Sequence, residues 1–478
     1  MNISILGLKS TYLRLILFIL IFITSLMNLS AKELQVRNLD IQGNKHTQQW
    51  VILREIDIHP GNTIVQENIA YRLEINKQNL INTGIFSDVD INVTTWDHEN
   101  SLIDISISVI ESWYIFPGII FQIADRNFNQ WWVENKRSLK RVNTGILATH
   151  VNLTGNRDVF KVKAHAGFTQ KLELYYNLPL PFTNGDYEIF SSFFLGSSKE
   201  IAIRSEENKQ IFERNESETL LNRIRVSSGV TKRKGLYIRH SLLLSFHNNK
   251  IPNWLPEATN PDFFGSGNTQ QRYFVAEFQF NFDNRRPIIY PVEGVLLRIK
   301  TTKEGLGIFN DLNRFSINPN LSYSLSFYDN YHATIKNRSR LFLQHHNGKD
   351  PYYNYKALGY GDSNLRGYEY YVVDGSDFTL FQIDFVRKII DNKISLPMPS
   401  WAKKLSIIPF RIYLSLQGDA GYVKDEYYSF NNSFVNRWLY SGGLGLNIII
   451  YQNFHFSLDY SVNHLAKGGL YLHFNTSY

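Results

Sequence analysis

From residue 112 to residue 478 the sequence repeats stretches of about ten residues in which apolar and polar side chains alternate. In 454–463 the even positions are apolar and the odd positions are polar, whereas 316–327 alternates with the opposite parity. Successive side chains of a β-strand point to opposite faces, so each stretch predicts a strand with one apolar face. Such strands, separated by turn residues, are typical of transmembrane β-barrels, whose sheets close because lipid leaves open edges unpaired.

Divided at its turn residues, this region predicts a mainly β fold, a 16-stranded antiparallel transmembrane β-barrel over residues 112–478. The even number of strands agrees with bacterial barrels of this class. Short links such as 154–156 and 329–330 alternate with long links such as 198–217 and 347–376, as periplasmic turns alternate with outer loops. The expected strands are 113–124, 139–152, 158–168, 170–180, 185–197, 218–230, 235–248, 270–283, 293–303, 313–327, 331–346, 377–391, 406–422, 436–450, 453–464 and 468–478.

Periodicity alone leaves a large soluble β-sandwich or propeller open, because it does not say which face of each strand points outward. The length of the strands, a predicted export signal and an aromatic content of 14% favour the membrane barrel. A helical membrane protein is excluded, because the sequence lacks the repeated apolar runs of about 20 residues that spanning helices need. The chain has no cysteine, which excludes disulfides and cysteine metal sites.

Residues 1–31 are predicted to be a signal peptide. Lys9 and Arg14 precede the apolar run 15–23, and the segment ends in small residues near Ala31. A basic start, an apolar stretch of about 7–15 residues and a small residue at the cut define such a signal. Cleavage is expected after Ala31, and an uncleaved anchor is the alternative.

Residues 32–111 predict a small α+β domain, with two helices on one face of a three-stranded sheet. An exposed edge of such a sheet can pair with an extended peptide, so a binding module is one interpretation and a spacer is the other. The expected elements are a strand at 34–42, a helix at 47–55 with Thr47 as its N-cap, a helix at 65–82, and strands at 89–95 and 102–109.

Short motifs punctuate both regions. In the small domain they are Ile41-Gln42-Gly43-Asn44, Thr83-Gly84-Ile85-Phe86 and Val109-Ile110-Glu111. In the barrel region they are Leu365-Arg366-Gly367-Tyr368, Gln417-Gly418-Asp419-Ala420-Gly421, and Asp283-Asn284-Arg285 followed by Pro291 and Gly294. Their order resembles the superfamily of outer-membrane assembly factors and two-partner-secretion transporters, of the BamA, TamA and FhaC type. By this resemblance residues 32–111 are a POTRA domain.

Each of the three barrel motifs resembles a motif of that superfamily. Residues 365–368 look like the loop-six motif Val/Ile-Arg-Gly-Phe/Tyr. Residues 417–421 look like the motif Phe-x-Asp-x-Gly, with Gln417 where the family prefers Phe. Residues 283–294 look like the hairpin between two central strands.

A pairing between loop six and the barrel wall follows. In the family, loop six folds back into the barrel, where its Arg contacts acidic or polar groups. Asp419 shares its parity with Ser415 and Gln417, which predicts that it faces the lumen. We expect Arg366 to hold Asp419 bidentately, and Asp384 on the preceding strand is a candidate third member. A solvated turn arginine is the alternative.

The resemblance implies a protein that assembles, inserts or translocates polypeptides at the outer membrane of a Gram-negative bacterium, with its POTRA domain in the periplasm. It implies no enzymatic activity, nucleotide, metal or other cofactor. The implied partners are unfolded outer-membrane or secreted proteins, the lipid bilayer, and chaperones or accessory lipoproteins at the POTRA domain. Polypeptides would insert between the first and last strands, where an unpaired edge borders lipid. No basic tract points to nucleic acid.

Other functions remain open. A dedicated secretion pore of the two-partner type usually carries two POTRA domains and an N-terminal plug helix, whereas Lys32-Glu33 leads directly into the first strand. A passive porin or structural barrel is a further interpretation. Because general assembly factors typically carry more POTRA domains, a single one favours an accessory or lineage-specific member.

Overall fold

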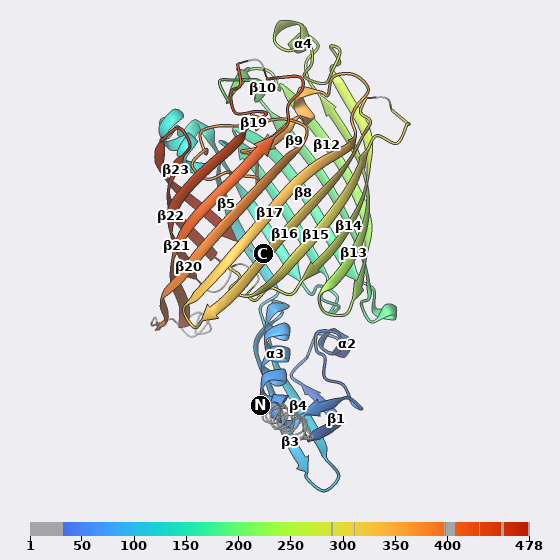
Figure 1. The fold of residues 1–478 in the computed structure, drawn as a ribbon. Coiled ribbons are helices and arrows are strands. Elements are labelled where there is room, and N and C mark those ends of the chain that lie inside the picture. Colours follow the sequence, from blue (N-terminus) through green and yellow to red (C-terminus); the bar gives the residue numbers. More distant parts are fainter. Residues whose placement is uncertain are drawn as a thin grey trace, which may run out of the picture. The chain divides into compact units, whose positions relative to one another are not determined.

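The computed structural model describes residues 32–287, 290–309, 311–395, 397, 407–429, 431–450 and 454–476. The predicted signal peptide lies outside the described residues. The chain divides into two compact units between Ser112 and Trp113 (Figure 1).

The described part of the first unit is a four-stranded sheet with helices, in the strand order β2-β1-β4-β3. β1 runs parallel to β4, and β4 runs antiparallel to β3. Alternate residues of β4 are buried, among them Ile103, Ile105 and Ile107, so this sheet turns its apolar face into a core. The elements are β1 (Glu33–Gln42), α2 (Gln49–Leu53), β2 (Thr63–Val65), η1 (Gln66–Asn68), α3 (Ile69–Asn82), β3 (Phe86–Asp97) and β4 (Leu102–Glu111).

Two details of the first unit differ from the prediction. The predicted three-stranded sheet was wrong, because β2, in the link just before the expected helix 65–82, pairs with the start of β1 as a fourth strand. Its three residues are too few to show an alternation. Thr47 is not the N-cap of α2, which is Gln48 without a side-chain cap. Instead, the backbone N–H of Thr47 donates to Glu111 Oε1 at 2.6 Å, which fastens this loop to the end of β4.

Within the described residues, the second unit contains one sheet of sixteen strands, in unbroken sequence order from β5 to β24 (Figure 1). All neighbours pair antiparallel, and the sheet curls into the predicted barrel, which confirms the predicted fold class. The strands are β5 (Ile115–Ile123), β6 (Val142–Val151), β7 (Val159–Gly167), β8 (Thr169–Pro179), β9 (Tyr187–Ser198), β12 (Leu221–Lys234), β13 (Ile238–Lys250), β14 (Gln270–Asp283), β15 (Gly294–Glu304), β16 (Arg314–Tyr328), β17 (Tyr331–Gln344), β20 (Phe378–Ser395), β21 (Ile407–Val423), β22 (Trp438–Ile450), β23 (Phe454–Asn463) and β24 (Gly468–Thr476).

The barrel strands turn their apolar residues outward. In β23, Asp459 and Ser461 are buried, whereas Leu458 and Tyr460 are exposed. The same inversion recurs around the sheet, because a lumen lined by polar groups and an outer apolar surface suit a wall that borders lipid. Among the described residues, no helix has the length and the apolar content needed to cross a membrane.

Long connections gather at one end of the barrel, which we call the outer end. The long link predicted at 198–217 carries a hairpin of two short strands that pair only with each other. The smaller elements of the second unit are η2 (Gln130–Glu134), η3 (Leu139–Arg141), η4 (Pro181–Thr183), β10 (Glu200–Glu206), β11 (Lys209–Arg214), α4 (Leu255–Ala258), η5 (Tyr352–Asn354), β18 (Lys356–Leu358) and β19 (Val373–Asp374).

Candidate functional site

The link between β17 and β20 holds the loop-six motif in a fixed position. Leu365 and Tyr368 are buried in an apolar cluster that also contains Leu358 and Leu380. The hydroxyl of Tyr368 donates to the backbone oxygen of Tyr440 at 3.1 Å. These contacts anchor the motif on both sides of Arg366 and leave little freedom to its backbone.

Arg366 contacts both predicted carboxylates. Its Nε donates to Asp419 Oδ1 at 2.9 Å, and its Nη1 donates to Asp384 Oδ1 at 2.6 Å. Its backbone N–H also donates to Asp419 Oδ2 at 3.0 Å. The structure therefore brings together a loop residue and two strand residues far apart in sequence, as the parity of Asp419 predicted.

The charges of this cluster balance. Lys336 Nζ lies 3.3 Å from Asp384 Oδ2, so two cations face two carboxylates. Gln382, directly opposite Asp419 on β20, donates to Asp419 Oδ2 at 2.9 Å. Burying an ionised group is costly unless it is paired and hydrogen-bonded, and here each carboxylate has several donors. The arrangement fixes the loop against the wall without leaving a net charge.

Two residues of the β21 motif, Gly421 and Gln417, shape the contacts of this strand with loop six and with β23. A Cβ at Gly421 would lie 2.9 Å from Leu358 Cδ1, so glycine lets the loop pack close to the strand. Gln417 Nε2 donates to Ser415 Oγ at 2.9 Å and to Asp459 Oδ1 at 2.8 Å. The departure from the family's Phe thus extends the polar network to β23. Gly445 on β22, which lies opposite Ser415, leaves space for the Gln417 amide, because a Cβ there would clash with Gln417 Nε2.

The network reaches the last strand through residues that the sequence reasoning missed. Glu369, beside the motif, is buried, and its Oε1 lies 3.7 Å from His473 Nε2 on β24. The same His473 atom lies 3.7 Å from Asp459 Oδ2. The burial of Glu369 raises the pKa of its carboxyl. Within the described ranges, no cluster of His, Asp and Glu has an arrangement suited to a metal ion.

The hairpin motif lies apart from Arg366 and organises the β14–β15 link. Arg285 Nε and Nη2 hold Asp283 bidentately, each at 2.8 Å. Gly294 has a φ of +102°, and a Cβ there would lie 2.7 Å from Arg285 Cα, so only glycine fits. Pro291 is half-buried. The motif therefore shapes the turn rather than the lumen cluster.

One residue of this link reaches the lumen wall opposite. The ring of Tyr290 lies 4.8 Å from that of Tyr413 on β21 and 5.2 Å from that of His455 on β23, centroid to centroid. His455 in turn contacts Asn447 Oδ1 at 2.9 Å. The hairpin thus packs against the strands that carry the polar network. The signal in the sequence was an aromatic residue within a turn, which alone does not say what it contacts.

The β10–β11 hairpin closes over the outer end. At its tip, the N–H of Asn208 donates to Asn432 Oδ1 at 2.8 Å, and Asn208 Oδ1 accepts from the N–H of Phe434 at 3.0 Å. The carbonyl of Asn208 accepts from the N–H of Val372 at 2.8 Å. The hairpin is therefore joined both to loop six and to the β21–β22 link. Ile201 of the hairpin belongs to an apolar cluster that also includes Phe263, Phe264 and Tyr352.

Comparison with known proteins agrees with this geometry. Residues 34–112 match the POTRA family model, described as a surface antigen variable number repeat. The crystal structure of BamA from Haemophilus ducreyi lacking POTRA domains 1-3 aligns with 92% of this chain and 83% of its own, with a TM-score of 0.54 and 14% identity. The chain has the fold of BamA.

A second solved structure has the same fold. CdiB from Acinetobacter baumannii aligns with 94% of this chain and 74% of its own, with a TM-score of 0.51 and 13% identity. None of the curated sequences compared with the chain matches it significantly. The predicted resemblance is confirmed at the level of the fold, a POTRA domain followed by a BamA-like barrel.

Proposed function

We propose that this protein assembles, inserts or translocates polypeptides at the outer membrane of a Gram-negative bacterium, without nucleotide, after removal of residues 1–31. Its POTRA domain, within residues 32–111, would lie in the periplasm and bind unfolded clients or accessory proteins. The barrel of residues 112–478 would present a strand edge to those clients. The observation that carries this proposal is the state of the two ends of the sheet.

β5 and β24 end the hydrogen-bonded order of the described strands, and we call the boundary between their free edges the seam. The carbonyl of Tyr114 accepts from the N–H of Val151, and the N–H of Ala124 donates to the carbonyl of Arg141. Both contacts use even-numbered residues, so the even positions of β5 turn their backbone groups toward β6. The odd positions face the seam.

One of the backbone N–H donors that the free edge of β5 would present to the seam is missing. Pro117 is at an odd position of β5, and proline has no backbone N–H. Proline is tolerated in edge strands, where it weakens pairing with a further strand. Pairing across the seam therefore lacks one hydrogen bond near the start of β5. A client strand that adds to an edge competes with a weakened closure.

The outer end argues against a passive porin. Asn208 joins the β10–β11 hairpin to the β21–β22 link, and Arg366 holds loop six against the lumen wall. An open aqueous channel would need these segments to leave. A dedicated two-partner secretion pore shares the fold, so only its clients separate it from a broader assembly factor.

Depletion followed by quantitative proteomics of purified outer membranes tests the proposal. A broad fall in β-barrel proteins would support an assembly factor. Loss of one or a few surface or secreted proteins would support a dedicated translocator. An unchanged proteome, together with large single-channel conductance that persists without residues 33–111, would refute both and leave the passive barrel.

The seam itself is tested with cysteine pairs, because the chain has no cysteine of its own. Ile119→Cys is combined in turn with Leu470→Cys, Leu472→Cys or Phe474→Cys, all exposed on the outer faces of β5 and β24. The matched control is Ile119→Cys with Ile146→Cys, which face each other across β5 and β6. Oxidation of the seam pair should abolish complementation, and reductant should restore it. Full activity of the oxidised seam pair would reject a moving seam.

A further inference from the structure

The link between β5 and β6 carries a short segment at the outer rim of the barrel. Residues 131–140, here called the rim segment, have the sequence WWVENKRSLK. They include most of η2 and the start of η3. Figure 1 draws this link as a pale blue-green coil at the outer end. None of the sequence motifs and none of the lumen contacts described above involves this segment.

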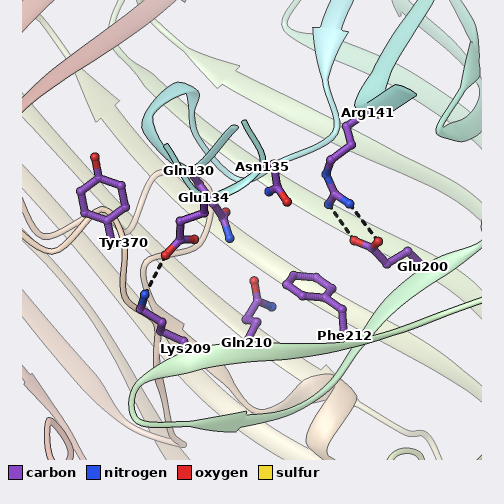
Figure 2. Close-up of a pocket in the computed structure, with 9 residues that line it drawn as sticks. All are labelled: Gln130, Glu134, Asn135, Arg141, Glu200, Lys209, Gln210, Phe212 and Tyr370. Atoms are coloured by element: carbon purple, nitrogen blue, oxygen red, sulfur yellow. Dashed lines mark hydrogen bonds and ion pairs between the residues drawn. The ribbon is translucent and has the colours of Figure 1, made fainter. Parts of the chain in front are cut away.

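The inner side of the segment is polar and paired (Figure 2). Glu134 Oε1 accepts from Lys209 Nζ of the β10–β11 hairpin at 2.8 Å. Asn135 Nδ2 donates to Asp125 Oδ1 at 2.9 Å. Arg141, just after the segment, holds Glu200 through two contacts of 2.7 and 2.8 Å. All of these residues except Asp125 border a cavity of about 270 Å³. The nearby carboxylates therefore already have partners on the inner side of the segment.

The outer side of the segment is apolar. Trp132 is 45% exposed, Val133 is 59% exposed and Leu139 is 73% exposed. On β5, the strand that precedes this link, Ile119 and Phe121 are also strongly exposed. Scattered apolar residues on a surface need no explanation, but three exposed apolar side chains within eight residues, in a link that directly follows a strand with an exposed apolar face, do.

Cations flank this apolar area without acidic partners. Lys136, Arg137 and Lys140 are exposed, and no ion pair joins them to a carboxylate within the part of the chain that the structure describes. The guanidinium of Arg137 lies 4.4 Å from the centre of the Trp132 ring. Lys136 and Arg137 both have left-handed backbone conformations, with φ of 48° and 58°. Two such residues in succession are uncommon outside glycine, and here they place two exposed cations at consecutive positions of one turn.

We propose that the rim segment binds the phosphate-bearing headgroups of anionic lipids, with Trp132, Val133 and Leu139 at the acyl boundary. Aromatic residues concentrate at membrane interfaces, and exposed Lys and Arg next to apolar side chains attract anionic lipid. A soluble acidic partner would satisfy the charges but would leave the exposed apolar side chains of the segment in water. This inference rests on the proposed membrane location of the barrel. It also fixes the outer end of β5, one side of the seam, to the lipid surface.

Site-directed spin labelling tests the inference in the full chain, reconstituted in phosphatidylcholine vesicles with and without phosphatidylglycerol. Single cysteines carry the nitroxide at Leu139 in the rim segment, at Leu416 on the exposed face of β21, and at Glu216, whose side chain is 82% exposed in an outer loop. Leu416 is the lipid reference and Glu216 is the water reference. The measurement is the accessibility of each label to oxygen relative to a water-soluble nickel reagent.

The label at Leu139 should give the lipid value in anionic vesicles and shift toward the water value in pure phosphatidylcholine. The combined substitution Lys136→Gln, Arg137→Gln and Lys140→Gln should remove that dependence on lipid charge. The comparison of vesicles uses native cations, so it stands even where the combined variant folds poorly.

Distinct outcomes would overturn distinct claims. A water value at Leu139 in both vesicles, with a lipid value at Leu416, would reject the rim segment as a membrane contact and leave the proposed function intact. Equal lipid values at Leu139 in both vesicles would reject headgroup recognition. A water value at Leu416 would refute the membrane barrel itself, and with it both the function and this inference.

Discussion

The β4 strand of the POTRA domain and the β23 strand of the barrel share one sequence pattern and use it in opposite ways. Ile103, Ile105 and Ile107 of β4 are buried in a core, whereas Leu458 and Tyr460 of β23 are exposed. Alternation specifies that a strand has two unlike faces, but the surroundings decide which face is inside. Water around the first unit drives its apolar face inward, and the proposed lipid surroundings of the second unit would remove that drive.

The same contrast applies to charge. Arg37 holds Asp104 on the surface of the POTRA domain, with Nε to Oδ1 at 2.9 Å, and Arg366 holds Asp419 inside the barrel at the same distance. The arginine side chain is 47% exposed in the first pair and 14% exposed in the second. Breaking the exposed pair should therefore cost less free energy of unfolding than breaking the buried pair, although the distances are equal, because water screens the exposed charges.

The largest expected effect is the loss of Arg366. Arg366→Met leaves Asp419 buried without its cation, and breaking one side of a buried ion pair costs about 3–5 kcal/mol. When samples are heated before electrophoresis, the Arg366→Met variant should change from the fast mobility of the folded barrel to the mobility of the unfolded chain at a lower temperature than the parent protein does. Arg37→Met is the matched control in the exposed pair. Equal stability of the two variants would contradict the difference between the two surroundings.

Apolar truncation should rank the two strands in the reverse order. Ile105→Ala empties part of the POTRA core and should cost about 2–5 kcal/mol of unfolding free energy. Leu458→Ala removes an exposed side chain and should cost about 0.5 kcal/mol or less in detergent. Denaturant unfolding of the full chain, followed by domain-specific proteolysis, measures both. A larger cost at Leu458 would mean that the barrel packs this side chain against protein.

A smaller effect is expected at the seam. Pro117→Ala adds one backbone donor to the free edge of β5, and one hydrogen bond contributes about 0.5–1.5 kcal/mol. The variant should resist thermal unfolding better and complement depletion less well. Gly118→Ala is its control, because position 118 turns its backbone toward β6 and a Cβ there meets only ordinary contacts. The same gain in both variants would assign the effect to strand propensity.

The smallest effect is a pH dependence of the exposed pair. The hydrogen bond from Arg37 lowers the pKa of the Asp104 carboxyl below its ordinary value. A carboxyl whose pKa is lower in the folded state contributes stability above its unfolded pKa and loses it as pH falls through the folded pKa. Unfolding of the parent should therefore depend more steeply on pH than that of Arg37→Met in acid. Parallel curves would remove this pair from the stability of the domain.

The sequence predicted all sixteen barrel strands because each of them repeats its alternation long enough to be recognised. Short elements were not predicted, because they contain too few residues to show an alternation. β2 has three residues, and the β10–β11 hairpin pairs only with itself, outside the order of the barrel. Thr47 suited a helix cap by residue type, but its backbone is held by Glu111 from the far end of the domain. Local patterns do not report such distant partners.

Some residues of the candidate site were predicted from the sequence, and others were not. Parity placed Asp419 in the lumen, and the family resemblance supplied Arg366 as its partner. Glu369, His473 and Tyr290 were not found, because their contacts arise only when the sheet closes and brings distant strands together. Gln417 was noted as a departure from the family pattern, but its link to Asp459 depends on the register of β21, β22 and β23.

The contacts at the tip of the β10–β11 hairpin should depend little on the pH and salt concentration of the surrounding medium. Asn208 is joined to the opposite loops through Asn432, Phe434 and Val372, by amide and backbone groups alone. Such groups do not titrate, and dissolved ions screen them far less than they screen opposite charges. Acid or concentrated salt would weaken the ion pairs at the sides of this hairpin, Lys209–Glu134 and Arg141–Glu200, but would leave the contacts at its tip in place.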